Sequence, residues 1–351
     1  MIIHSGVHDY ELRMEEDFSF VKQLLRDPAA YYVVDEKLYG LYPTLFSGID
    51  SERLTLLKAA EEEKNLDTAL AICERMRKMK QKRNARLISF GGGITQDVTG
   101  FAANVLYRGV HWTFVPTTLL AACDSCIGGK TSLNYKGYKN LLGTFYPPEQ
   151  IYVCPRFFET LTEMDFLSGL GEVVKFNLLK GSEGVAAMER DIPGLLKRDT
   201  ALVARYTKSS LDFKKPFIEA DEYDRGIRVH LNFAHTFGHA LETVTNFAIP
   251  HGTAVAMGMV VANHISQLRG LIEPGAVERM EGVLRRVIPV DAIPAHTDMS
   301  AVIAAIGNDK KQVDGGVTAV LMEQGGALRL VHDVTSEEVD AGYQRLAELK
   351  F

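Results

Sequence analysis

Residues 85–97 read ARLISFGGGITQD, and the apolar run VTGFAANVL follows at residues 98–106. A short apolar segment that ends in three glycines and continues with helical spacing is typical of a strand, a tight turn and a helix in a βαβ unit. Glycines at such a turn let backbone N–H groups approach a pyrophosphate at the start of the helix. Because the spacing is not the GxGxxG of the dinucleotide fingerprint, a plain strand-to-helix turn stays open as an alternative.

Similar apolar runs lie on both sides of this stretch. We expect strands at YYVVD (31–35), HWTFVPTT (111–118) and QIYVCP (150–155), and a charged helical stretch at about residues 51–80. Strands that alternate with helices predict a parallel sheet in an α/β domain.

Beyond about residue 163, apolar residues recur at three- and four-residue spacing in LSGLGEVVKFNLL, VARYTKSSLDFKK, HTFGHALETVTNF and TAVAMGMVVANHISQL. This spacing predicts an all-α domain. The chain is therefore expected to contain an α/β domain at residues 1–160 and an all-α domain at residues 161–351.

Composition narrows the class of protein. The 351 residues are 46% hydrophobic, enough for two cores, and the net charge is -6. An acidic chain argues against nucleic acid or acidic lipid as a partner. The acidic amino terminus and the lack of an apolar run of about 18 residues predict a cytoplasmic protein with no membrane partner. The CDSC stretch at residues 123–126 has the spacing of a redox or zinc half-site, but without a second pair we interpret its thiols as buried and free.

Three histidines lie close together in the helical half. His235 and His239 are four residues apart on one predicted helix face, and His251 follows a proline turn. A divalent metal site explains this cluster if a carboxylate joins it, and Glu172, which shares a helix face with Lys175, is a candidate. The alternative is that these histidines cap a helix or form hydrogen bonds in the core.

A polar block follows the strand expected at residues 111–118. Its GGKT at residues 128–131 imitates the end of a P-loop, but Asp124 stands where a P-loop has glycine. Positive charge and hydrogen-bond donors gather nearby, on Arg108, Lys130, Lys139 and Asn140. Such a set suits a small phosphorylated ligand.

In chain order, these blocks resemble the dehydroquinate synthase family, which belongs to the sugar-phosphate cyclases. The resemblance is carried by GGGITQDVTGF, YRGV, PTTLLAACDS, GGKTSLN, KNLLGTFYPP, GEVVK, ADEYDRGIRVHLNFAHTFGHALE and HGTAVAMG, and runs from about residue 30 to about residue 320. It implies an NAD-binding α/β domain followed by a helical domain that holds a divalent metal, zinc or else cobalt. It also implies a site in a cleft between the domains, completed in a homodimer.

The resemblance also implies roles for particular residues. The metal ligands are expected to be Glu172, His235 and His251. The residues expected to bind NAD are Asp35, Gly92, Gly93, Asp97, Thr117, Thr118, Lys139, Thr160 and Leu161. The catalytic residues are expected to be Asp124, Lys130, Lys175, Lys214, Arg228, Asn232 and His239, and further substrate contacts to be Arg108, Asn140, Lys310 and Lys311.

The implied reaction converts 3-deoxy-arabino-heptulosonate 7-phosphate to 3-dehydroquinate and phosphate. It proceeds by transient oxidation with NAD, phosphate elimination, re-reduction and an intramolecular aldol closure, so NAD is not consumed. Related cyclases form 2-deoxy-scyllo-inosose, 2-epi-5-epi-valiolone or amino-dehydroquinate, and a metal-dependent polyol or glycerol dehydrogenase is a further alternative. The retained Lys214, Arg228 and Asn232 favour an acidic substrate.

The sequence departs from the family pattern at several positions. Gln96 replaces a small residue, Asn177 and Ala234 replace glycines, and Thr253 replaces a glutamate. The family's Glu-x-x-Lys pair on the adenine side is not evident, and Asp50 and Arg53 lie at similar spacing.

Overall fold

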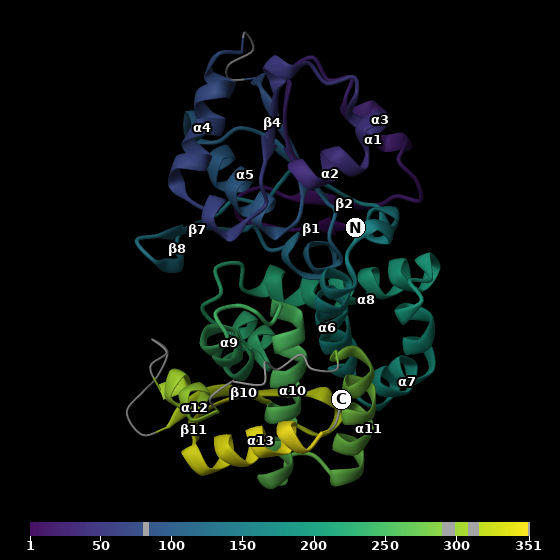
Figure 1. Ribbon diagram of the computed structural model, residues 1–351, viewed down its shortest axis with the longest axis vertical. Coiled ribbons are helices and arrows are strands. Elements are labelled where there is room, and N and C mark those ends of the chain that lie inside the picture. Colours follow the sequence, from purple (N-terminus) through teal and green to yellow (C-terminus); the bar gives the residue numbers. More distant parts are fainter. Residues whose placement is uncertain (80–83, 290–298, 308–315, 350–351) are drawn as a thin grey trace. The chain divides into compact units, whose positions relative to one another are not determined.

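The computed structural model describes residues 1–79, 84–289, 299–307 and 316–349. The chain forms two compact units, drawn in the sequence colours of Figure 1. Unit 1 contains Met1–Leu161 and Ile218–Tyr223, and unit 2 contains Thr162–Phe217 and Asp224–Phe351. The sequence pattern did not predict that a short segment from the second half of the chain joins unit 1.

Unit 1 is built on a seven-stranded sheet in which all neighbouring strands except one pair are parallel. The strand order is β1 (Ile2–Ile3), β2 (Tyr10–Met14), β9 (Gln150–Val153), β6 (Trp112–Pro116), β5 (Arg86–Gly91), β3 (Ala30–Asp35) and β4 (Leu54–Leu57). Within this sheet, as far as the structure describes the chain, the only antiparallel pair is β1 with β2. Every residue of β6 is buried, as expected for a parallel strand covered on both faces. The predicted α/β domain with a parallel sheet is confirmed.

The helices of unit 1 are α1 (Ser19–Leu24), α2 (Glu36–Leu41), α3 (Pro43–Phe46), α4 (Leu66–Arg77) and α5 (Gly93–Val105). An antiparallel hairpin joins β7 (Lys130–Tyr135) to β8 (Tyr138–Phe145). Of the charged helical stretch expected at about residues 51–80, α4 is helical, but the first part contains the edge strand β4 instead. Among the residues that the structure describes, β4 pairs with β3 alone, and its charged flanks masked a short apolar strand.

Unit 2 is helical. Its helices are α6 (Glu163–Leu178), α7 (Ser182–Leu196), α8 (Thr200–Ala220), α9 (His235–Val244), α10 (His251–Leu268), α11 (Pro274–Val287), α12 (Met299–Gly307) and α13 (Ser336–Glu348). α10 is buried along most of its length and contacts α6, α9, α11 and α13, so it forms the centre of the unit. The predicted helical domain is confirmed, and a hairpin of β10 (Val317–Met322) and β11 (Leu328–Val334) is added to it. Among the described residues, no helix has the length and apolar character needed to cross a bilayer.

Candidate active site

The centre of the candidate site is a buried ion pair on α6. Glu172 is 0% exposed and Lys175 is 1% exposed, and the Lys175 Nζ lies 2.6 Å from the Glu172 Oε2. The two residues share a face of α6 because they are three positions apart. Burying either charge alone would be costly, so each requires the other or a further ionic partner.

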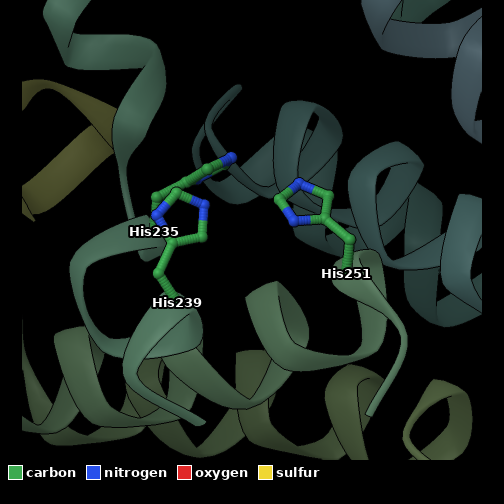
Figure 2. Close-up of side chains that lie close together, drawn as sticks. All are labelled: His235, His239 and His251. Atoms are coloured by element: carbon green, nitrogen blue, oxygen red, sulfur yellow. The ribbon is translucent and has the colours of Figure 1, made fainter. Parts of the chain in front are cut away.

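Two imidazoles lie beside this carboxylate, and a third lies close to those two. The Nε2 atoms of His235 and His251 each lie 3.5 Å from the Glu172 Oε1. Ligand atoms of His235, His239 and His251 all lie within 4.8 Å of one another. Figure 2 shows the rings of His235 and His239 rising from one helix, with the His251 ring facing them from another segment. The histidine cluster of the sequence is therefore a cluster in space.

Glycines allow the helices to bring these side chains together. A Cβ on Gly252 would lie 1.7 Å from the Ser168 carbonyl oxygen, and a Cβ on Gly171 would lie 2.1 Å from the Gly252 carbonyl oxygen. The backbones of α6 and α10 thus touch directly beside Glu172 and His251. The Gly252 N–H also donates to the Ser168 hydroxyl at 3.1 Å.

The second ring nitrogen of each inner histidine faces an oxygen acceptor. The His235 Nδ1 lies 3.0 Å from the Phe233 carbonyl oxygen, and the His251 Nδ1 lies 3.3 Å from the Glu242 Oε2. When Nδ1 donates to such an acceptor, the lone pair of the neutral ring is on Nε2. In the neutral form that binds a metal, both rings would then present the lone pair of Nε2 on the side of Glu172.

Burial and neighbouring charges shift the pKa values of Glu172, His235 and His251 in different directions. Burial raises the pKa of Glu172, but the Lys175 charge and the hydrogen bond and charge of His251 outweigh it, so the pKa is held below its usual range. Burial, together with the Lys175 charge, lowers the pKa of His235 well below its usual value. Burial also acts to lower the pKa of His251, but Glu172 and Glu242 raise it to about 10. Glu172 is therefore an anion and His235 a neutral imidazole near pH 7.

The donor set fits a divalent cation. Ligand atoms bound tetrahedrally to zinc at about 2.0–2.1 Å lie about 3.4 Å apart, close to the 3.5 Å that separates each Nε2 from the Glu172 Oε1. Both Glu172 oxygens are buried, and their near neighbours are the Lys175 ammonium and the imidazoles of His235 and His251. The three histidines form a second possible set. We favour Glu172, His235 and His251, because the His239 side chain is 52% exposed and its Nε2 lies toward Glu242.

Lys175 connects this centre to the segment that carries other predicted residues. Its Nζ donates to the Leu231 carbonyl oxygen at 3.2 Å. Leu231 belongs to the 3-10 helix Ile227–Asn232, which contains Arg228 and Asn232. Arg228 is 4% exposed, and Lys214 of α8 is 6% exposed. Unit 2 thus contains all the predicted metal ligands together with Lys175, Lys214, Arg228, Asn232 and His239.

Most of the residues expected to bind NAD follow the carboxyl ends of adjacent parallel strands of unit 1. Asp35 ends β3, Gly92 and Gly93 follow β5, and Thr117 and Thr118 follow β6. Thr160 ends the 3-10 helix Pro155–Thr160 after β9, and Leu161 follows it. This edge of a parallel sheet is where open α/β folds bind ligands. Gly92 and Thr118 are close, because a Cβ on Gly92 would lie 2.9 Å from the Thr118 Cγ2. Gly92 has no side chain to cap the first N–H groups of α5, which suits an anion.

Asp97 and Asn140 lie in a polar cluster that sequence reasoning missed in part. The Lys64 Nζ lies 2.6 Å from the Asp97 Oδ2 and donates to the Asn140 Oδ1 at 2.6 Å. The Ser132 hydroxyl donates to Asp97 at 3.0 Å, and burial raises the pKa of Asp97 despite Lys64 and Ser132. The remaining predicted residue here, Lys139, pairs with Glu61 at 3.4 Å.

Glu61 and Lys64, rather than Asp50 and Arg53, have the residues and spacing of the Glu-x-x-Lys pattern. A run of three glutamates before Lys64 hid this signal. Arg53 instead donates to the carbonyl oxygens of Asp27 and Pro28 at 3.0 and 3.2 Å, a structural role.

The other predicted residues of unit 1 lie near its loops. Asp124 belongs to a single π-helical turn, Ala121–Ser125, a feature often found at functional sites. Gln96 holds this turn: its Nε2 donates to the Ser125 carbonyl oxygen and its Oε1 accepts from the Ser125 hydroxyl, each at 2.7 Å. Lys130 is exposed at the start of β7, and Arg108 is exposed after α5. Lys310 and Lys311 lie outside the described residues.

Two known protein families match successive parts of this chain. Residues 54–168 match the family described as 3-dehydroquinate synthase N-terminal, and residues 169–312 match 3-dehydroquinate synthase C-terminal. The chain is 34% identical over 315 residues to the 3-dehydroquinate synthase of Clostridium tetani, covering 88% of this chain and 83% of that protein. It is 35% identical over 296 residues to the 2-epi-valiolone synthase of Actinosynnema mirum, covering 83% and 78%.

A solved structure agrees in fold over nearly the whole chain. The 2-epi-5-epi-valiolone synthase ValA of Streptomyces hygroscopicus, solved with NAD+ and Zn2+ bound, gives a TM-score of 0.83 at 25% identity and covers 97% of both chains. The fold, the site and these relatives define one class of protein, the sugar-phosphate cyclases. Within this class, the chain belongs to the 3-dehydroquinate synthase family.

Proposed function

We propose that this cyclase is a 3-dehydroquinate synthase, which converts 3-deoxy-arabino-heptulosonate 7-phosphate to 3-dehydroquinate and phosphate. The observation that carries this choice is the burial of two cations in unit 2, Arg228 at 4% and Lys214 at 6% exposure. Both cations are held in place by the fold, and a guanidinium can bind the carboxylate of an acidic substrate through two parallel hydrogen bonds.

The cofactors of the proposed reaction are NAD and a divalent cation, with zinc as the expected metal. Glu172, His235 and His251 would hold the cation, and Asp35, Gly92, Thr117 and their neighbours on the same sheet edge would hold NAD. When bound, NAD accepts a hydride from a secondary alcohol and returns it later, and the cation lowers the pKa of a hydroxyl group that it contacts.

The side chains of the chain then have three tasks. Arg228 and Lys214 bind the carboxylate, while Asp124 and Lys175 orient the hydroxyl groups. The phosphate is bound by Arg108, Lys130, Asn140, Asn232 and His239. Their contribution is positioning and fixed charge.

Overall, a C–O bond to phosphate breaks and a ring C–C bond forms. The oxidation and the later reduction cancel, so each turnover releases one phosphate and no NADH. A polyol dehydrogenase of similar fold would instead accumulate NADH.

A second candidate is a cyclase that acts on a neutral sugar phosphate. It is favoured by the similarity to the 2-epi-valiolone synthase of Actinosynnema mirum, which is 35% identical. Such a substrate has no carboxylate, so the two candidates differ in what Arg228 contributes.

The test compares three substrates in the wild-type protein and in a variant that lacks the Arg228 charge. Protein loaded with metal and NAD is given 3-deoxy-arabino-heptulosonate 7-phosphate, sedoheptulose 7-phosphate or glucose 6-phosphate, and phosphate release and the carbon product are measured. We expect dehydroquinate from the acid alone. The Arg228→Gln variant should lower kcat/KM for the acid by about 10- to 100-fold, because a charge-assisted hydrogen bond contributes about 1.5–3 kcal/mol.

The matched control is Lys208→Gln, a cation of α8 that is 56% exposed and paired with Asp212. It should leave all three rates unchanged. Turnover of a neutral sugar phosphate alone would overturn the acidic substrate and favour the second candidate.

A further inference from the structure

Glu242 is a buried acid beside the candidate metal site that none of the roles above uses. It lies near the end of α9, the helix that also carries His235 and His239, and it is 9% exposed. Its Oε2 lies 3.3 Å from the His251 Nδ1 and 3.8 Å from the His239 Nε2. One carboxylate oxygen thus faces two of the three clustered imidazoles.

The contact with His251 decides which ring nitrogen can bind a metal. A carboxylate accepts a hydrogen bond, so the proton of the neutral ring lies on Nδ1 and the lone pair on Nε2. That Nε2 is the atom 3.5 Å from the Glu172 Oε1. For His235 the Phe233 carbonyl oxygen has the same effect from 3.0 Å. His251 therefore depends on a side chain for an orientation that His235 obtains from the backbone.

Charge gives a second reason for an acid at this position. Lys175 lies 2.6 Å from Glu172 and neutralises that carboxylate. The pair alone offers a divalent cation no net negative charge. Glu242 supplies that charge from the far side of the His251 ring.

We propose that Glu242 is a positioning residue of the metal site: it orients the His251 ring and adds the negative charge that a divalent cation requires. Groups that accept a hydrogen bond from a metal-binding histidine typically raise metal affinity by roughly 10- to 100-fold. The inference rests on the proposed metal ligands Glu172, His235 and His251.

The backbone contacts of Glu242 separate this role from a purely structural one. Its carbonyl oxygen accepts from the Phe247 N–H at 2.7 Å and from the Thr245 hydroxyl at 3.3 Å. A change of side chain leaves these bonds at the end of α9 intact. If Glu242 only completed the end of α9, substitution of its side chain would therefore change metal binding little.

The experiment measures metal binding by the full chain. Metal-free protein is titrated with Zn2+ against a competing chelator, and with Co2+ while the visible absorption of the bound ion is recorded. Glu242→Gln removes the charge but keeps an acceptor, whereas Glu242→Ala removes both. We expect Zn2+ affinity to fall about 10-fold and about 100-fold, respectively, with a changed Co2+ spectrum. The Tm of the metal-free variants shows separately whether they fold.

The matched control is Glu189→Gln, a half-exposed acid paired with Arg279 at 2.6 Å, which should bind metal like the wild type. If Glu242→Ala does not fold, Glu242→Gln and Glu242→Asp still test the proposal, and Asp, whose side chain is shorter, should also bind less tightly. Wild-type affinity and an unchanged Co2+ spectrum in the Glu242 variants would overturn it.

The Glu172→Gln variant distinguishes failure of the Glu242 proposal from failure of the proposed metal site. If Glu172→Gln binds metal as tightly as the wild type, the proposed ligands are wrong, and the proposed function loses its metal centre. If Glu172→Gln loses the metal while the Glu242 variants retain it, only the role of Glu242 is wrong.

Discussion

Glu172 and Lys175 form an ion pair that is fully removed from water, with 0% and 1% exposure. Removing one partner of such a pair leaves an uncompensated charge. We expect Lys175→Met to lower the free energy of unfolding of the metal-free protein by about 3–5 kcal/mol. Zn2+ should restore part of the loss, because it replaces the missing positive charge.

Chemical denaturation with and without Zn2+ measures both effects. Lys208→Met is the control, since Lys208 is 56% exposed in its pair with Asp212, and it should change stability by about 0.5 kcal/mol at most. Equal losses in the two variants, or a loss that Zn2+ does not reduce, would contradict a buried pair at a metal site.

Ala234 stands where the family pattern has glycine, and its backbone conformation explains why glycine is preferred there. It precedes α9 with φ 70° and ψ -16°, a left-handed conformation. A Cβ in this region costs about 1–2 kcal/mol, partly offset because glycine loses more conformational entropy on folding. Ala234→Gly should therefore raise the free energy of unfolding by about 0.5–1 kcal/mol.

Thermal or denaturant unfolding measures this change. Ala240→Gly, inside the same helix, is the control and should lower stability by about 1 kcal/mol. A loss of stability in both variants would show that the left-handed residue is not strained.

The sequence predicted more at some residues than at others. His235, His239 and His251 could be grouped because helical spacing and one short turn bring them together. The reciprocal hydrogen bonds of Gln96 with Ser125 could not be predicted, since they join residues of different elements. The contact of His251 with Glu242 was missed because an acid near the end of an amphipathic helix is usually a solvated residue.

At the scale of elements, the crossing of α6 and α10 is the most constrained contact of the site. The added Cβ of Gly252→Ala would lie 1.7 Å from a backbone oxygen that cannot move independently of α6. We expect a loss of about 3 kcal/mol in stability and weaker Zn2+ binding, because the crossing positions Glu172 and His251.

Gly282→Ala in α11 is the matched control, because nothing lies within 4 Å of its added Cβ. It should raise stability by about 0.4–1 kcal/mol. Wild-type stability and Zn2+ affinity in Gly252→Ala would show that the helices do not depend on this close approach.

Strand prediction succeeded in the interior of the sheet and failed at its edge. β3, β5, β6 and β9 are buried parallel strands and therefore appear as continuous apolar runs. β4 is an edge strand of four residues between charged segments, so its sequence pattern favours a helix. The β10 and β11 hairpin was also missed, because its residues follow a long helical region.

For the whole molecule, the order of the domains and the class of protein followed from motifs spread over most of the chain. The homodimer stays a prediction from the family resemblance, and sedimentation equilibrium would test it. The entry of Ile218–Tyr223 into unit 1 could not be predicted, since it continues the helix α8 of unit 2.

The proposed reaction uses NAD without consuming it. The most direct test measures phosphate and NADH in the same reaction, with metal, NAD and 3-deoxy-arabino-heptulosonate 7-phosphate deuterated at the carbinol carbon that is oxidised. We predict many phosphates per protein, no accumulation of NADH, and deuterium retained in the dehydroquinate. One NADH per substrate consumed, with deuterium transferred to the released cofactor, would contradict the account and identify a dehydrogenase.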